Sequence, residues 1–122
     1  MSRDKLSEFL DLRPAQFRFL ESISLRRRLS GGGAGPFHVS LTLVDSLPPS
    51  TRLHLDFAGV RGLKIGDIDC LYAWFVEIRS VAESGLEEGL RFRVVESEHD
   101  SLSLWCQDFV ARVETANPLK YP

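Results

Sequence analysis

Two polar residues on one predicted strand could carry acid–base chemistry. In LHLDF (residues 53–57), His54 and Asp56 alternate with apolar residues, so both should point to one face of the strand. A carboxylate can orient an imidazole as a general base, but a hydrolytic site also needs a nucleophile or a substrate pocket. The sequence places no serine beside this pair. Because polar residues on the solvated face of a strand are common, we interpret both as structural and predict no enzyme.

The histidines do not have the spacing of a metal site. His38, His54 and His99 belong neither to an HExxH motif nor to paired Cys-x-x-Cys motifs. The charged segment at residues 96–100 (ESEHD) could hold a cation weakly, but a strand that ends in a charged turn explains it equally well. We predict no metal and no cofactor.

Two glycine-containing segments could contact a phosphate group. Residues 31–36 (GGGAGP) lack the Gly-Lys-Ser/Thr and the helix of a nucleotide-binding loop, so we expect a flexible hairpin loop. Residues 59–62 (GVRG) have the GxxG spacing of one class of RNA-binding loop, but strands flank them, which favours a β-bulge. The three arginines at 26–28 are too short a basic run for a chain of net charge −2. We predict no nucleic-acid partner.

Charge is distributed unevenly along the chain. Residues 1–30 hold seven basic and four acidic side chains, whereas residues 82–108 hold two basic and seven acidic ones. Charge of one sign speeds the encounter with an oppositely charged partner and helps to select it. We expect an acidic face that binds a basic protein; the alternative is a solvated surface that keeps the protein soluble. The residues assigned to this face are Glu83, Glu87, Glu88, Glu96, Glu98 and Asp100.

Length and composition indicate one domain over residues 1–122. With 43% hydrophobic and 26% charged residues, the chain can build a core without metals or disulfides. Cys70 and Cys106 lack an activating base or a Cys-x-x-Cys motif and are predicted to be reduced core thiols. No apolar run reaches the roughly 20 residues of a membrane span, and no signal peptide is visible, so we expect a cytoplasmic protein with no membrane contact.

Apolar residues with a period of two predict that most of the chain is β-strand. A short amphipathic helix precedes the strands within residues 1–13, with Ser2 as its expected cap, and residues 115–122 form a tail. Residues 70–81 are the most hydrophobic segment and should be a central strand covered on both faces. The expected strands are 17–28 (where a helix also fits), 37–44, 53–57, 60–65, 70–81, a strand through Phe92 and Val94, and 102–106 extended by 109–113.

This pattern predicts a mainly β (α+β) fold. Its short connections favour antiparallel neighbours, so we expect a twisted antiparallel sheet folded as a sandwich or a partly open barrel, with one N-terminal helix. Exposed sheet edges leave homodimerisation open.

Three segments carry a resemblance to known proteins: LHLDFAGVRGLKI, WFVEIRSV and GLRFRVVESEHDSLSLWCQDF. This pattern resembles small bacterial proteins of unknown function, some of which are similar to immunity proteins of bacterial polymorphic toxin systems. Those proteins are compact, cytosolic and non-enzymatic. The resemblance covers residues 52–109 and implies a β-rich fold and a bacterial origin. The matching residues, all expected in core or turn positions, are Phe57, Gly59, Val60, Leu63 and Cys106.

The favoured function is therefore a non-enzymatic interaction module, in its sharpest form an immunity-type inhibitor that docks a basic partner through the acidic face. The alternative is a carrier of small apolar ligands, with a cavity among Trp74, Phe75, Phe92 and Trp105. An enzyme that uses His54 and Asp56 ranks third.

Overall fold

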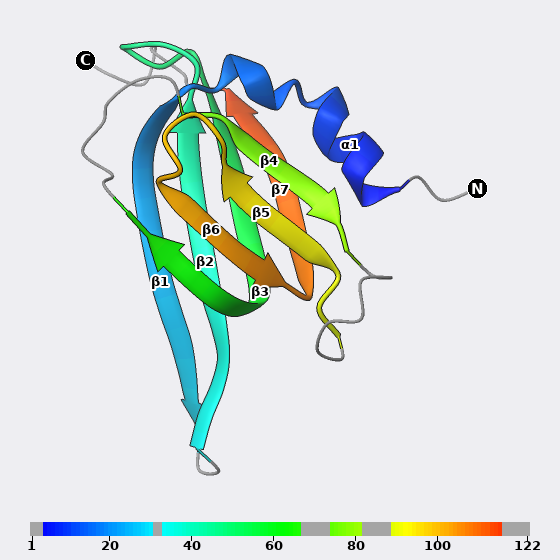
Figure 1. Cartoon of the computed structure of the whole chain (residues 1–122). Helices are drawn as coiled ribbons and strands as arrows, with labels where there is room; N and C mark the ends of the chain where they lie inside the picture. Colours follow the sequence, from blue (N-terminus) through cyan, green and yellow to red (C-terminus); the bar gives the residue numbers. More distant parts are fainter. Residues whose placement is uncertain (1–3, 31–32, 67–73, 82–88, 116–122) are drawn as a thin grey trace.

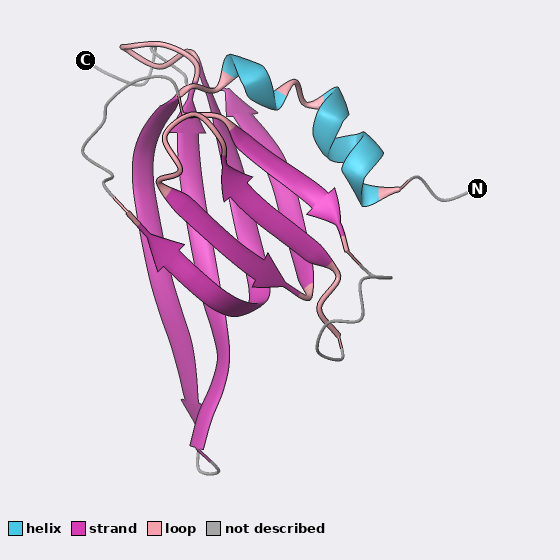
Figure 2. Cartoon of the chain, in the orientation of Figure 1, coloured by secondary structure: helices cyan, strands magenta, loops and turns pink. Residues whose placement is uncertain are grey.

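The computed structural model describes residues 4–30, 33–66, 74–81 and 89–115. Over these residues the chain forms one short helix, one 3₁₀ turn and seven strands (Figures 1 and 2). The elements are α1 (Lys5–Asp11), η1 (Pro14–Gln16), β1 (Phe19–Ser30), β2 (Gly33–Val44), β3 (Thr51–Ile65), β4 (Val76–Ser80), β5 (Phe92–Glu96), β6 (Leu102–Cys106) and β7 (Asp108–Thr115).

The strands form one open antiparallel sheet in the order β1-β2-β3-β6-β5-β4, with β7 also paired to β3. Strand β3 is long enough to pair with different strands along its two halves. Residues 52–60 pair with β2 and residues 51–58 with β7, whereas residues 61–65 pair with β6. The sheet thus folds over along β3, and β4, β5 and β6 run diagonally across the layer of β1, β2, β3 and β7 (Figure 1). The predicted mainly β fold with a short N-terminal helix is confirmed.

The fold-over takes place at the two glycines of the 59–62 segment. Gly59 and Gly62 have backbone φ angles of 64° and 62°, values that residues with a side chain rarely adopt. The pairing of β3 with β6 also shifts register between Arg61 and Lys64, as in a β-bulge. Beside this corner the chain passes from β6 into β7, where the Gln107 backbone N–H donates to the Ala58 carbonyl at 3.0 Å. The predicted bulge and strand corner are confirmed.

The core lies between the two layers. Along most of its strands, buried side chains alternate with side chains that face outward. Phe109 on β7 contacts aromatic rings of the helix and of both layers. The Phe109 ring centroid lies 6.1 Å from that of Phe9 in α1, 6.5 Å from that of Phe57 in β3 and 5.0 Å from that of Phe92 in β5. These contacts connect the helix and both layers. The buried apolar residues of the described strands are Val39, Leu41, Leu43, Val44, Leu53, Leu55, Phe57, Val60, Val76, Phe92, Val94, Leu102, Leu104, Cys106 and Phe109.

Helix α1 lies at the open side of the fold, next to β4 and β7 (Figure 1). Its N-cap is Asp4, whose carboxylate accepts the Leu6 backbone N–H at 3.3 Å; the predicted cap, Ser2, lies outside the described residues. Phe9 is buried, and the Lys5 ammonium donates to the Phe109 carbonyl at 2.7 Å. The helix is therefore fixed to β7 by the apolar contact of Phe9 and by polar contacts of Lys5.

Three predicted elements differ from the structure. Residues 33–36 were expected in a loop but start β2, because small residues in extended conformation can pair with the end of β1. The segment 70–81 was expected to be a central strand, yet β4 covers only 76–80 and lies at the end of the strand order. Its hydrophobicity reflects the burial of Trp74 and Val76 in the core; residues 67–73, with Cys70, lie outside the described part.

The third difference concerns residues 109–113, which do not extend β6. They belong to a separate strand, β7, which pairs with the other half of β3. The polar residues 107–108 mark the change of layer and not a break within one strand. Of the predicted tail, Thr115 ends β7 and residues 116–122 lie outside the described part of the chain.

Replacing Gly59 by alanine should destabilise the fold. An added Cβ would overlap the Gln107 side chain, and the left-handed φ of 64° disfavours any side chain. We expect the free energy of unfolding to fall by about 1–2 kcal/mol in guanidinium titrations. Gly66→Ala is the matched control, since its Cβ would meet neighbouring atoms only at ordinary contact distances of 3.5 Å or more. Equal losses in the two variants would contradict the assigned role of the corner.

Candidate functional site

The acidic residues predicted to form one face do not all lie on the surface. Glu98 and Asp100 are exposed in the turn at residues 97–100, which connects β5 to β6. Glu96, at the end of β5, is fully buried, with 0% relative exposure. Glu83, Glu87 and Glu88 lie outside the described residues. We call residues 97–100 the acidic turn.

Glu96 is an anchor of this turn and not a docking residue. Its carboxylate accepts backbone N–H groups from Phe75 at 3.0 Å, Glu98 at 2.8 Å, His99 at 2.9 Å and Ser101 at 3.2 Å. A buried carboxylate needs such donors to replace its hydration. The prediction that Glu96 belongs to the exposed acidic face is therefore wrong, because its charge is used inside the protein.

The environment of Glu96 keeps its carboxyl group ionised. Burial by itself would raise the pKa, but the four backbone donors outweigh burial and lower the pKa below its usual value. The anchored backbone then turns through Asp100, which has a φ angle of 53°. The turn that carries Glu98 and Asp100 is thus held by hydrogen bonds to the buried Glu96 carboxylate.

Two other charged residues of the segment 82–108, Asp108 and Arg93, lie on strands and away from the acidic turn. Asp108 forms an ion pair with Lys5 of α1 at 2.5 Å, and this hydrogen bond is the main reason that the pKa of Asp108 is lowered. Arg93 lies on the outer face of β5, since Phe92 and Val94 on either side of it are buried. The segment that is most acidic in sequence therefore also contributes a cation to a sheet face.

The outer face of β4, β5 and β6 carries an arginine and tryptophan cluster that sequence reasoning missed. Arg93 pairs across the strands with Trp105, and Trp105 pairs with Arg61 of β3. The guanidinium carbon of Arg93 lies 4.3 Å from the Trp105 ring centroid, a cation–π contact. The alternation of FRVVE and LSLWC contained the signal, because it places Arg93 and Trp105 opposite to the buried residues.

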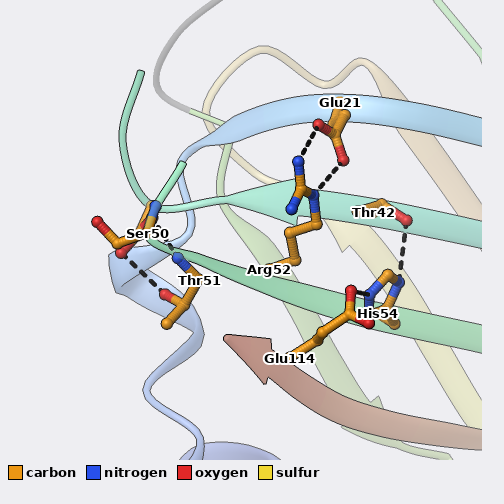
Figure 3. A network of polar contacts seen from close by, with 8 residues as sticks. Glu21, Thr42, Ser50, Thr51, Arg52, His54 and Glu114 are labelled. Atoms are coloured by element: carbon orange, nitrogen blue, oxygen red, sulfur yellow. Dashed lines mark hydrogen bonds and ion pairs between the residues drawn. The ribbon is translucent and has the colours of Figure 1, made fainter. Parts of the chain in front are cut away.

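His54 and Asp56 do not form the pair considered for acid–base chemistry. The ring nitrogens of His54 lie 3.2 Å from the Thr42 hydroxyl and 3.1 Å from the Glu114 carboxylate (Figure 3). Asp56 instead accepts a hydrogen bond from the Ser40 hydroxyl at 2.5 Å. Both residues lie on the outer face of the β1-β2-β3-β7 layer and bond to neighbouring strands, which supports their structural interpretation.

A second polar network fixes the connection between β2 and β3 (Figure 3). Asp45 accepts the backbone N–H groups of Ser50 and Thr51 at 3.0 Å each, and the Thr51 hydroxyl at 2.8 Å. Burial would raise the pKa of Asp45, but these hydrogen bonds lower it to about 2. Arg52, at the start of β3, forms an ion pair with Glu21 of β1 at 2.8 Å. These contacts stabilise the layer.

The aromatic residues proposed to line a ligand cavity do not share one. Trp74 and Phe92 are buried in the core, whereas Trp105 lies on the outer face of β6. Two grooves lie beside α1: one of about 380 Å³ between the helix and β7, and one of about 350 Å³ between the helix and β4, which Phe75 lines. The four aromatic residues thus lie in different parts of the protein, and the carrier hypothesis stays a prediction.

Three further observations concern cofactors, redox chemistry and membranes. Within the described residues, no group of three His, Cys, Asp or Glu side chains lies close enough together to hold a metal ion. Cys106 is a buried free thiol, and burial followed by the charge of Asp108 raises its pKa to about 12. None of the described helices has the length and apolar character required to cross a bilayer.

Comparison with protein families gives a match over most of the chain. The model of a family described as Immunity protein PIM8 matches residues 1–112. The matched range begins before α1 and ends within β7, so it includes both the acidic turn and the Arg93–Trp105 cluster. No curated protein and no solved structure matches the chain. The resemblance to immunity proteins is confirmed.

Replacing Glu96 by glutamine should destabilise the protein at neutral pH. The amide presents one oxygen and an NH₂ group to four N–H donors, so we expect a loss of about 2–4 kcal/mol in the free energy of unfolding at pH 7. Because the folded-state pKa of Glu96 is lowered, its stabilisation is present above the unfolded pKa near 4.5 and disappears as pH falls through the folded value.

The difference between wild type and Glu96→Gln should therefore shrink below about pH 4.5 in denaturant titrations. Glu98→Gln, which removes an exposed carboxylate two residues away, is the control and should change stability by at most about 0.5 kcal/mol. A Glu96→Gln difference that is constant with pH would show that the carboxylate charge is not what holds the turn.

Proposed function

The chain belongs to the immunity protein PIM8 family, and we propose that this immunity-type inhibitor binds a basic surface of its partner toxin through the acidic turn. The exposed carboxylates of Glu98 and Asp100 are the contacts that the described residues supply. Glu83, Glu87 and Glu88, which lie outside the described residues, stay a prediction as further acidic contacts. Glu96 is removed from the contact surface and becomes the residue that positions the turn.

The buried Glu96 carboxylate is the observation that carries this proposal. A charge without hydration is unfavourable unless hydrogen bonds replace the water, and here four backbone donors of Phe75 and of the residues after Glu96 do so. The result is a turn whose backbone is fixed before binding. A preordered turn loses little conformational entropy when a partner docks, which favours affinity.

The exposure of Glu98 and Asp100 determines how their carboxylates would contribute to toxin binding. Carboxylates in contact with water add modest affinity, but they accelerate association with a basic surface and make it sensitive to salt. Inhibition would follow from occupying the toxin surface and requires no reaction by the immunity protein. We place this inhibition in the cytoplasm, and a second copy paired through the end strand β1 or β4 stays a prediction.

The test is to neutralise the acidic turn and measure toxin binding. Tagged wild-type protein would capture partners from a lysate of the source organism, and the captured protein would be produced alone to test its toxicity. We expect Glu98→Gln with Asp100→Asn to weaken binding of the toxin about tenfold, or about 1.4 kcal/mol, by calorimetry in about 50 mM NaCl. Asparagine suits position 100 because it tolerates the positive φ of 53°.

A matched control distinguishes the effect of the acidic turn on binding from the effect of the protein's net charge. Glu8→Gln with Glu114→Gln also removes two exposed carboxylates, one on α1 and one on β7, and should leave binding nearly unchanged. A toxic partner that binds both double variants equally would overturn the acidic turn as the contact. A captured protein with no toxicity, or with toxicity that the wild type does not block, would overturn the inhibitor function itself.

A further inference from the structure

One row of side chains crosses the outer face of the β4-β5-β6 layer. In cross-strand register Arg79 of β4 is opposite Arg93 of β5, Arg93 is opposite Trp105 of β6, and Trp105 is opposite Arg61 of β3. Residues that face each other across antiparallel strands point to the same side of the sheet. We call Arg61, Trp105, Arg93 and Arg79 the Arg–Trp row.

The centre of this row is closely packed. Trp105 is half-buried although it points outward, and the Arg93 guanidinium stacks on its ring at 4.3 Å. Below the indole lies Gly62, where an added Cβ would come within 3.1 Å of Trp105 Cδ1. The glycine that bends β3 therefore also makes room for the tryptophan, so the same corner that folds the sheet positions the row.

The described residues of this face have a net charge opposite to that of the whole chain. Beside the row, Lys64 is opposite Ser103 and shares its outward side. Among the described residues in this register, Glu77 is the acidic one, and Arg79 donates to its carboxylate at 2.8 Å. Within the described part of the chain, four cations and one carboxylate thus share this face, whereas the net charge of the whole chain is −2. The acidic turn lies at one end of the β5–β6 hairpin and the Arg93–Trp105 pair toward the other.

We propose that the Arg–Trp row is a docking surface for a carboxylate-rich segment of a protein partner. Arginine forks bind carboxylates with two parallel hydrogen bonds, and Trp and Arg are the residues that most often dominate binding energy at protein interfaces. The inference deepens the proposed function and rests on it only for the identity of the partner, which would be the toxin. The toxin would present basic groups to the acidic turn and acidic groups to the row, which would fix its orientation on the sheet.

The same features disfavour a nucleic acid on this face. Single-stranded binders offer free aromatic faces on which bases stack, whereas the Trp105 ring is already stacked by Arg93. A polyanion would also be repelled by the net negative chain and by Glu77 within the patch, while a short acidic segment needs to contact only a few cations. An oligonucleotide is therefore the competing probe in the test.

The experiment uses the two tryptophans as reporters by ¹H–¹⁵N NMR. Trp74 is fully buried and Trp105 lies in the row, so the full chain gives two indole N–H signals, which Trp105→Phe assigns. On titration with a short peptide of alternating Glu and Asp at low salt, we expect the Trp105 signal to shift and the Trp74 signal to stay. Arg93→Gln should weaken peptide binding about tenfold, and Arg79→Gln should weaken it to a smaller degree.

Arg112→Gln on β7 is the matched control, because it removes one exposed arginine from the opposite layer. Circular dichroism would confirm that each variant is folded. An unmoved Trp105 signal, an equal effect of Arg112→Gln, or tighter binding of oligothymidine than of the peptide would each overturn the proposal. This result does not depend on capturing a toxin or on the Glu98 and Asp100 variant, so the two proposals can fail separately.

Discussion

The structure depends on one strand that belongs to two layers. Strand β3 pairs with β2 and β7 along its first half and with β6 along its last residues, and the change of partner requires the corner at Gly59 and Gly62. Without that corner the sheet could not fold over, and the apolar faces of the two layers would not meet. Phe109 then joins the layers and α1 through three ring contacts. The corner also leaves the space in which Trp105 lies.

The distribution of charge in space differs from its distribution along the chain. The segment 82–108 is strongly acidic in sequence, yet Glu96 is buried, Asp108 is paired with Lys5, and Arg93 lies on a sheet face beside Trp105. What the described surface presents is a small acidic turn at one end of the β5–β6 hairpin and a cationic face toward the other. An interface built on both would select a partner by orientation as well as by sign of charge.

The polar residues of the β1-β2-β3-β7 layer bond to neighbouring strands of the same layer. His54 and Asp56 do share one face of β3, as alternation requires. On that face, however, each finds a partner on a neighbouring strand: Thr42 and Glu114 for His54, and Ser40 for Asp56 (Figure 3). Membership of an immunity protein family is consistent with a fold whose polar groups stabilise a sheet and whose function is binding.

The sequence by itself determined most of the strands, the presence of the helix, the corner at the two glycines and the resemblance to immunity proteins, because alternation and glycine conformation are local properties of the chain. It did not determine that β7 leaves β6 to join β3, that β4 ends the sheet, or that Glu96 is buried while Arg93 meets Trp105. Each of these depends on which strands pair and in what register, and therefore on contacts between residues far apart in the chain. Only the folded sheet brings the Phe75 N–H to Glu96, buries the Glu96 carboxylate and aligns the Arg–Trp row across four strands.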